Sequence, residues 1–111
     1  MHVPKVQVPF DKAQKYVVFS VDAEEGHVDM LWGDPDLTWH NDIIEKAKSL
    51  GLAIHKIYGG GRIFIDEQKK QIFVWGTSDR FGPAPRYLVE EMIEGEYPDY
   101  KLLFNCEPHQ A

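Results

Sequence analysis

Cysteine and positive charge are both scarce in this sequence. Cys106 is the single cysteine among 111 residues, so no disulfide can form within the chain, and we expect a reducing, cytoplasmic setting. Lysine and arginine number 12 against 18 aspartates and glutamates, which gives a formal net charge of -6. Nucleic-acid-binding proteins are usually basic, so we expect no nucleic-acid partner. Any anionic ligand must be held by local donors against an unfavourable global field.

Long apolar runs are also lacking. No segment approaches the ~18 apolar residues of a membrane helix, so we expect no membrane partner. The first residues, MHVPKVQVPFDKAQK, contain no apolar run of the kind that marks a secretory signal. We expect loosely held ends over residues 1 to about 10 and after Cys106.

The remaining composition is that of an ordinary globular domain. Apolar residues make up 43% and charged residues 27% of the chain, which argues against disorder. A length of 111 residues suits one domain with a core between a sheet and one or two helices. We therefore expect residues 1–111 to form a single domain and to act as a monomer.

The pattern of apolar residues predicts about five or six short strands. Residues 16–21 (YVVFSV) are nearly all apolar, which is typical of a central strand buried on both faces. Residues 22–37 mix acids, glycines and a proline, and predict an irregular connection with a short strand around residues 27–32. Further strands are expected at residues 53–58, 62–66, 71–76 and 101–105, the middle two forming a hairpin.

Two helices are predicted between these strands. The first begins near Thr38, capped by Asp36 or Thr38, and stops at Gly51. The second covers residues 86–95, after Pro85 in a position that a first helical turn tolerates. A mixed sheet with one helix on each face, an α/β fold, would cover the apolar surface.

Three glycines interrupt the apolar stretch IYGGGRIFI. Gly59–Gly61 can bring backbone amides close to a ligand, and Arg62 offers a planar fork for phosphate or carboxylate. The stretch is not a P-loop, because the lysine, the hydroxyl and the helix that should follow are absent. On these residues alone, a bulged turn where two strands approach closely is the favoured alternative.

A second candidate anion site is the loop TSDRFGPA, residues 77–84, which ends a strand and opens a helix. Backbone amides in such a loop, together with a helix N-terminus, attract an anion. Ser78 adds a hydroxyl and Arg80 a cation. Taken alone, the loop is more simply an ordinary strand-to-helix turn.

His40 is the third candidate, because it faces inward yet lies in the first helical turn. The plain structural alternative is a partly buried histidine bonded to a backbone carbonyl. The positive end of the helix disfavours imidazolium, which keeps the ring neutral near neutral pH. A neutral ring has a lone pair for attack on phosphorus or for taking a proton from water.

The other histidines and the cysteine predict no further site. His27 lies in the acidic connection, and His55 alternates with apolar neighbours in a strand that leaves it facing solvent. No histidine pair has a metal-ligand spacing such as H-x-x-x-H, so we expect no dedicated zinc site. Cys106 lacks the arginine-bearing loop that a cysteine phosphatase needs.

The three candidates occur together and in order with other short motifs. KYVVFSV, WHNDIIEK, GGGRI, KKQIFVWGTSDRFGPA and YPDY resemble the protein phosphohistidine phosphatase family, also called the Janus or Ocnus family. The likeness runs from about Lys15 to Tyr100, most of the chain. It implies a small mixed sheet between two helices, no metal or organic cofactor, and removal of phosphate from histidine, and also lysine, side chains of protein substrates.

The resemblance also assigns roles to individual residues. His40 falls on the catalytic histidine. The other positions that it places at the phosphate or beside it are Lys15, Arg62, Ser78, Asp79, Arg80 and Gly82. Phosphate would rest on backbone amides of residues 78–82, with His40 opposite. Whether His40 attacks phosphorus itself or activates water stays open, as does the role of Arg62.

One segment departs from the family pattern. The stretch before the catalytic histidine is usually basic, whereas here Asp34 and Asp36 stand in it. Negative charge would weaken phosphate binding if it lay within a Debye length, ~8 Å at physiological salt. The leading hypothesis is a phosphohistidine phosphatase. The alternatives are a phosphoprotein-binding module without turnover, and a regulatory protein that recruits partners through an exposed strand edge.

Overall fold

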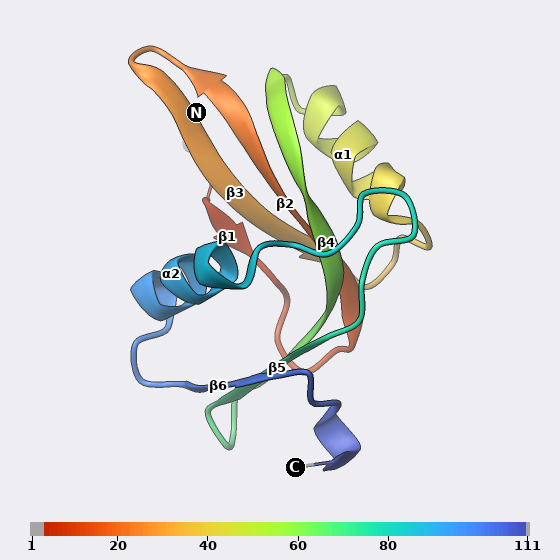
Figure 1. The fold of residues 1–111 in the computed structure, drawn as a ribbon, viewed down its shortest axis with the longest axis vertical. Coiled ribbons are helices and arrows are strands. Elements are labelled where there is room, and N and C mark those ends of the chain that lie inside the picture. Colours follow the sequence, from red (N-terminus) through yellow and green to blue (C-terminus); the bar gives the residue numbers. More distant parts are fainter. Residues whose placement is uncertain (1–3, 111) are drawn as a thin grey trace.

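The computed structural model describes residues 4–110, which form an α/β fold around one mixed sheet (Figure 1). Its six strands lie in the order β1-β3-β2-β4-β5-β6. Neighbours are antiparallel except for the pairs β1–β3 and β5–β6. The elements in chain order are β1 (Val6–Gln7), β2 (Gln14–Ala23), β3 (Gly26–Asp34), α1 (His40–Ser49), β4 (Ile54–Asp66), β5 (Gln71–Trp75), α2 (Arg86–Glu96), β6 (Lys101–Phe104) and a 3-10 turn (Pro108–Gln110).

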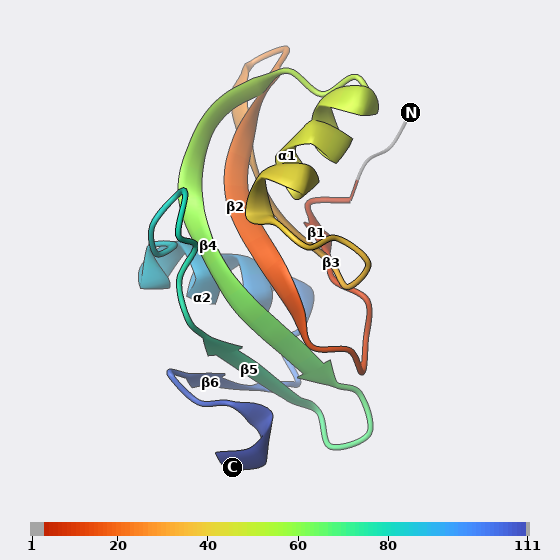
Figure 2. The ribbon, with the colours of Figure 1, turned by 90° about the vertical axis from the view of Figure 1, so that its right-hand side faces the viewer.

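The helices cover opposite faces of the sheet, which confirms the predicted architecture. Side chains alternate along β2, so Val17 packs with Ile43 of α1 while Val18 packs with Val89 of α2. Figure 2 shows α1 in front of the strands and α2 behind them. Residues 16–21 are all buried in the middle of the sheet, as their composition predicts. No helix within residues 4–110 is long and apolar enough to cross a membrane.

The first helix begins two residues later than predicted. Trp39 is its N-cap, and the Asp42 carboxylate accepts a hydrogen bond of 3.2 Å from the Trp39 amide. Neither Asp36 nor Thr38 caps the helix, so that prediction was wrong. The end is as predicted, with Gly51 in the left-handed region at φ +90° directly after the last turn. This shift makes His40 the first helical residue.

The connection predicted as irregular is largely a regular strand. β3 pairs with β2 along its whole length, from Ala23 opposite Gly26 to Lys15 opposite Asp34. The acidic residues at both ends of this segment led to the prediction of an irregular connection. The middle of the segment is apolar, and Leu31 and Trp32 there are buried. The predicted short strand around residues 27–32 lies inside β3.

The N-terminal segment is packed against the sheet, contrary to the prediction of a loose end. Residues 1–3 of that segment lie outside the described part of the chain. β1 pairs with β3, and Val6 and Val8 are buried in the core beneath α2. The Trp32 indole donates a hydrogen bond of 3.0 Å to the Pro4 carbonyl. Alternating valines therefore add a sixth strand to the sheet edge.

Candidate active site

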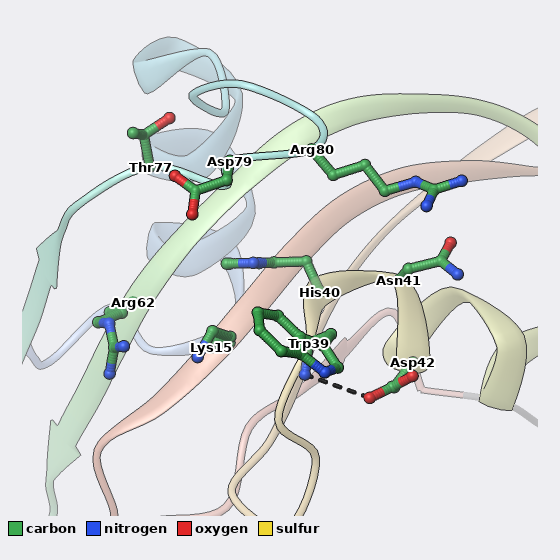
Figure 3. Close-up of a pocket in the computed structure, with 9 residues that line it drawn as sticks. All are labelled: Lys15, Trp39, His40, Asn41, Asp42, Arg62, Thr77, Asp79 and Arg80. Carbon is green, nitrogen blue, oxygen red and sulfur yellow. Dashed lines mark hydrogen bonds between the residues drawn. The ribbon is translucent and has the colours of Figure 1, made fainter.

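A cavity of about 770 Å³ opens between the start of α1, the strands β2 and β4, and the loop after β5. Three cationic and two acidic side chains line it, so its local charge is positive (3 - 2 = +1) in a chain of net charge -6. The lining residues, drawn in Figure 3, are Lys15, Trp39, His40, Asn41, Asp42, Arg62, Thr77, Asp79 and Arg80. Four of the predicted phosphate-site residues thus share one cavity with His40.

The His40 ring is held by a single buried hydrogen bond. The residue is only 8% exposed, and its Nε2 atom lies 2.9 Å from the carbonyl oxygen of Gly61. A carbonyl oxygen can only accept, so Nε2 carries the hydrogen and donates it. In the neutral ring, the lone pair is then on Nδ1. Figure 3 shows the ring projecting from the helix start into the space between Asp79 and the two basic residues of β2 and β4.

The surroundings favour the neutral ring. Burial is the largest cause that lowers the pKa of His40, and the positive charges of Lys15 and Arg62 lower it further. The hydrogen bond to Gly61 and the charge of Asp79 act in the opposite direction but do not outweigh them. The sequence points to the helix terminus as the cause, and the structure adds desolvation and two nearby cations. The ring is therefore neutral and basic at Nδ1 near neutral pH.

The glycine run lies inside one continuous strand, β4, and permits three separate close approaches. A Cβ on Gly59 would meet the Pro83 carbonyl, and one on Gly61 would meet the Trp75 carbonyl oxygen at 2.8 Å. A Cβ on Gly60 would meet the backbone of β2 on one side and the His40 ring at 3.0 Å on the other. The predicted close approach is therefore confirmed, but the predicted turn between strands 53–58 and 62–66 was wrong, because β4 continues through the glycines.

Gly60 also fastens the loop after β5 to the sheet. Its amide donates to the Gly82 carbonyl and its carbonyl accepts from the Ser78 amide, both at 3.0 Å. Pro83 forms an isolated parallel bridge with the same residue. The loop therefore lies against β4 beside the histidine, and a side chain at residue 60 would separate them.

Hydrogen bonds inside the loop turn some amides inward and leave others free. The Phe81 amide donates to the Ser78 hydroxyl oxygen, and the Gly82 amide donates to the Ser78 carbonyl. The amides of Asp79 and Arg80 have no hydrogen-bond partner among residues 4–110. Two donors next to His40 are thus unoccupied.

The predicted site residues of this loop fall into two groups. Ser78 is 2% exposed, and neither it nor Gly82 lines the cavity. Both shape the loop that carries Asp79 and Arg80. The Ser78 hydroxyl oxygen accepts a hydrogen bond from the Phe81 amide, which leaves the hydroxyl hydrogen available as a donor. Direct phosphate binding by this side chain stays a prediction.

The two basic residues of the strands lie side by side. Lys15 on β2 is paired with Arg62 on β4 in the sheet register, and both line the cavity. Neither forms an ion pair within the described part of the chain. Free cations beside a free pair of amides form a suitable environment for a phosphoryl group.

The acidic segment before α1 does not line this cavity. The Asp34 carboxylate is bound by the Lys46 ammonium at 2.7 Å and by the Asp36 amide at 2.9 Å. Burial alone would raise the pKa of Asp34, but these hydrogen bonds and the Lys46 charge lower it. Of the two aspartates that depart from the family pattern, Asp34 is thus compensated by a lysine in the last turn of α1.

Four lining residues were not identified from the sequence, namely Trp39, Asn41, Asp42 and Thr77. Trp39 is 65% exposed, which is unusual for so large an apolar side chain. Three of them are neighbours of His40 in the chain, and the fourth precedes Ser78. Their positions next to His40 and Ser78 in the sequence were the one signal that could have identified them as cavity residues.

Comparisons with known proteins identify the family of the chain. A sequence profile described as the Janus/Ocnus family matches residues 1–101. The chain is 35% identical over 110 residues to the sex-regulated protein janus-A of Drosophila melanogaster, covering 95% of this chain and 81% of the relative. It is 31% identical over 112 residues to the 14 kDa phosphohistidine phosphatase of Homo sapiens, covering 90% and 88%. The protein of that name from Sus scrofa is 30% identical, covering 90% and 87%. The chain therefore belongs to the Janus/Ocnus family.

Proposed function

We propose that the protein is a phosphatase that hydrolyses the P–N bond of phosphohistidine, and of phospholysine as a further substrate, with His40 as its catalytic residue. The observation that carries this proposal is the orientation of one ring. Nε2 is occupied by the Gly61 carbonyl, and Nδ1 of a neutral imidazole is left for chemistry in a cavity that also holds the cations Lys15 and Arg62 and is bordered by the loop with two free amides.

In the nucleophilic route, the Nδ1 lone pair attacks phosphorus. The P–N bond of the substrate breaks, and the protonated substrate imidazole leaves as a neutral ring. Water then attacks the phosphorylated His40, releases phosphate and restores the free ring. Exchange of one P–N bond for another is nearly balanced in energy, so positioning and charge compensation are the main requirements.

In the general-base route, Nδ1 takes a proton from water while the water oxygen attacks phosphorus. The P–N bond of the substrate breaks, the protonated substrate imidazole leaves as a neutral ring, and no covalent intermediate forms. Lys15 and Arg62 balance the charge of the phosphoryl oxygens in either route, and the amides of Asp79 and Arg80 donate to them. Rapid-quench trapping with radiolabelled substrate separates the routes, because only the nucleophilic route leaves label on His40.

Trp39 supplies a surface for the leaving group. Its exposed indole lines the cavity directly before the catalytic residue. A flat aromatic face can stack on the imidazole of a phosphohistidine side chain, which a compact phosphoserine lacks. Phosphohistidine would gain this stacking contact, whereas phospholysine would bind without it.

The central experiment offers a phosphohistidine peptide to wild type, His40→Ala and His40→Gln. Glutamine keeps a donor toward the Gly61 carbonyl but has no imidazole lone pair. We expect both variants to lose about 100-fold or more of turnover, the size of a general-base or nucleophile contribution. His109→Ala removes an exposed histidine near the C-terminus and serves as the matched control. Turnover by His40→Gln equal to that of wild type would refute the role of the ring.

The second candidate function is a phosphoprotein-binding or regulatory module that does not turn over its ligand. Two carboxylates, Asp42 and Asp79, line the cavity and oppose a dianionic phosphoryl group. The janus-A relatives are named sex-regulated proteins, a name that states no reaction. Tight binding of the phosphohistidine peptide without release of phosphate would favour this function.

We further propose that the protein acts as a cytoplasmic monomer on phosphohistidine-bearing proteins, without nucleic acid or membrane. The acidic net charge and the single, half-buried cysteine support these expectations. Light scattering coupled to size exclusion measures the oligomeric state, and a mass near 12.8 kDa is expected.

A further inference from the structure

Three potential metal ligands converge at the end of the sheet remote from the cavity. Asp22 near the end of β2 faces His27 near the start of β3 in the sheet register, and His55 lies near the start of β4. Figure 1 shows these three strand ends side by side, at the β2–β3 hairpin and the adjoining end of β4. Within residues 4–110 they form the one group of three or more histidine, cysteine or acidic donors close enough to hold an ion.

The ligand atoms are placed at distances that suit a shared cation. The Nδ1 atoms of His27 and His55 lie 3.4 and 3.8 Å from the same Asp22 oxygen, Oδ1. These distances exceed an ordinary hydrogen bond of ~2.7–3.2 Å, so the three atoms converge without bonding to one another. Donors on a tetrahedral zinc with bonds of ~2.1 Å are separated by ~3.4 Å. One donor from each residue lies within 4.8 Å of the other two.

We infer that Asp22, His27 and His55 form a surface site for a divalent transition-metal ion, with zinc as the representative. Two imidazoles and one carboxylate suit zinc, copper, nickel or cobalt rather than magnesium or calcium, which prefer oxygen donors alone. All three side chains are about half exposed, with fractions of 59%, 48% and 44%, so water fills the remaining coordination positions.

Only a small movement separates the present geometry from coordination. The two imidazole rings are stacked with centroids 3.5 Å apart and planes 9° from parallel. Parallel rings direct their lone pairs side by side, so the rings must splay for both Nδ1 atoms to meet one ion. The χ2 torsion of histidine is soft, and both rings are exposed, so this rotation costs little.

The electrostatic setting favours a cation at this end of the sheet. Glu24 and Glu25 form the exposed turn of the hairpin beside the cluster, and the whole chain is acidic. A bound ion would connect three neighbouring strands, and because it binds only the folded arrangement it would stabilise the fold by mass action. Ligand spacings within one helix, such as H-x-x-x-H, do not detect this site, because its ligands come from three strands.

The metal site is independent of the proposed phosphatase activity. Asp22 lies seven positions after Lys15 along β2, about 23 Å at ~3.3 Å per residue. Loss of metal binding therefore leaves turnover of phosphohistidine unchanged, and loss of His40 leaves metal binding unchanged. Failure of one proposal is thus distinguishable from failure of the other.

The test is titration of Zn²⁺ into the full chain, prepared without a histidine tag, by isothermal calorimetry. We expect one ion per chain and a melting temperature that rises with zinc concentration. Loss of a group that hydrogen-bonds to a metal ligand costs about 10- to 100-fold in affinity, so removing a ligand itself by His27→Ala, His55→Ala or Asp22→Asn should cost at least as much. His109→Ala is the matched control and should bind zinc like wild type. Long-range ¹H–¹⁵N spectra should report coordination through Nδ1 of both rings.

Two results would overturn the inference. One is the absence of zinc binding at micromolar concentrations. The other is binding that persists undiminished in His27→Ala and His55→Ala, which would place the ion elsewhere. Circular dichroism of the variants without metal checks that each one folds, and Asp22→Asn changes only one oxygen to nitrogen.

Discussion

Replacing Gly60 by alanine tests whether the glycine run exists to bring β4, the loop after β5 and His40 together. The added Cβ would fall well inside contact distance of the Tyr16 carbonyl oxygen and 3.0 Å from the Cδ2 atom of His40. The backbone of β2 cannot move aside as a flexible side chain would, because Tyr16 lies within a strand that is paired on both sides. The strain must therefore be taken up by displacement of β4, the loop or the imidazole ring.

The expected cost follows from overpacking of a well-filled region, about 1–3 kcal/mol. For 111 residues, an unfolding entropy of ~2.1 cal/mol/K per residue gives ~230 cal/mol/K, so each kcal/mol lowers the melting temperature by ~4 °C. Gly60→Ala should therefore melt about 4–13 °C below wild type. A shift of the His40 ring by ~1 Å can also cost up to ~100-fold in turnover of phosphohistidine.

The matched control is Gly95→Ala, the same chemical change in the last turn of α2. A Cβ at residue 95 meets nothing within 4 Å, and glycine inside a helix is less stable than alanine by about 0.5–1 kcal/mol. Thermal melting followed by circular dichroism should thus give shifts of opposite sign for the two variants. If Gly60→Ala melts at the wild-type temperature or above it, the packing explanation of the glycine run is wrong.

Three further outcomes follow from the site. The pKa of His40 lies below the ordinary value of 6.5, so kcat/KM should rise with pH through an inflection below 6.5. The stability that the neutral ring contributes should be lost as pH falls through that range. An inflection above 6.5 would contradict the argument that burial lowers this pKa. Lys46→Met leaves the Asp34 carboxylate without its cation, so the pKa of Asp34, followed by NMR titration, should rise, and no change would mean that the ion pair is absent in solution. Trp39→Ala should raise KM for a phosphohistidine peptide about 3- to 10-fold while melting like wild type, and an unchanged KM would exclude stacking.

Local patterns predicted most of the architecture. Every residue of the run YVVFSV except Ser20 is apolar. This pattern indicates a strand that is covered by a helix on each face of the sheet. The hairpin of β4 and β5 and the second helix were likewise visible in their periodicity. The pattern failed in β3 and at the N-terminus, because burial there is decided by neighbours that lie far away in the sequence: Val6 is covered by α2, and Trp32 by α1.

By itself, the sequence predicted the α/β class, a helix that begins close to the candidate histidine, and a short list of candidate phosphate-binding residues. Only the tertiary structure decided which nitrogen of His40 is free, which loop amides are unoccupied, and that Asp34 is paired with Lys46. It alone brought His27 and His55 to one aspartate from separate strands. The physical reason is that periodicity records which face of an element is buried, whereas hydrogen-bond partners and convergent donors depend on the register between strands, which no single segment encodes.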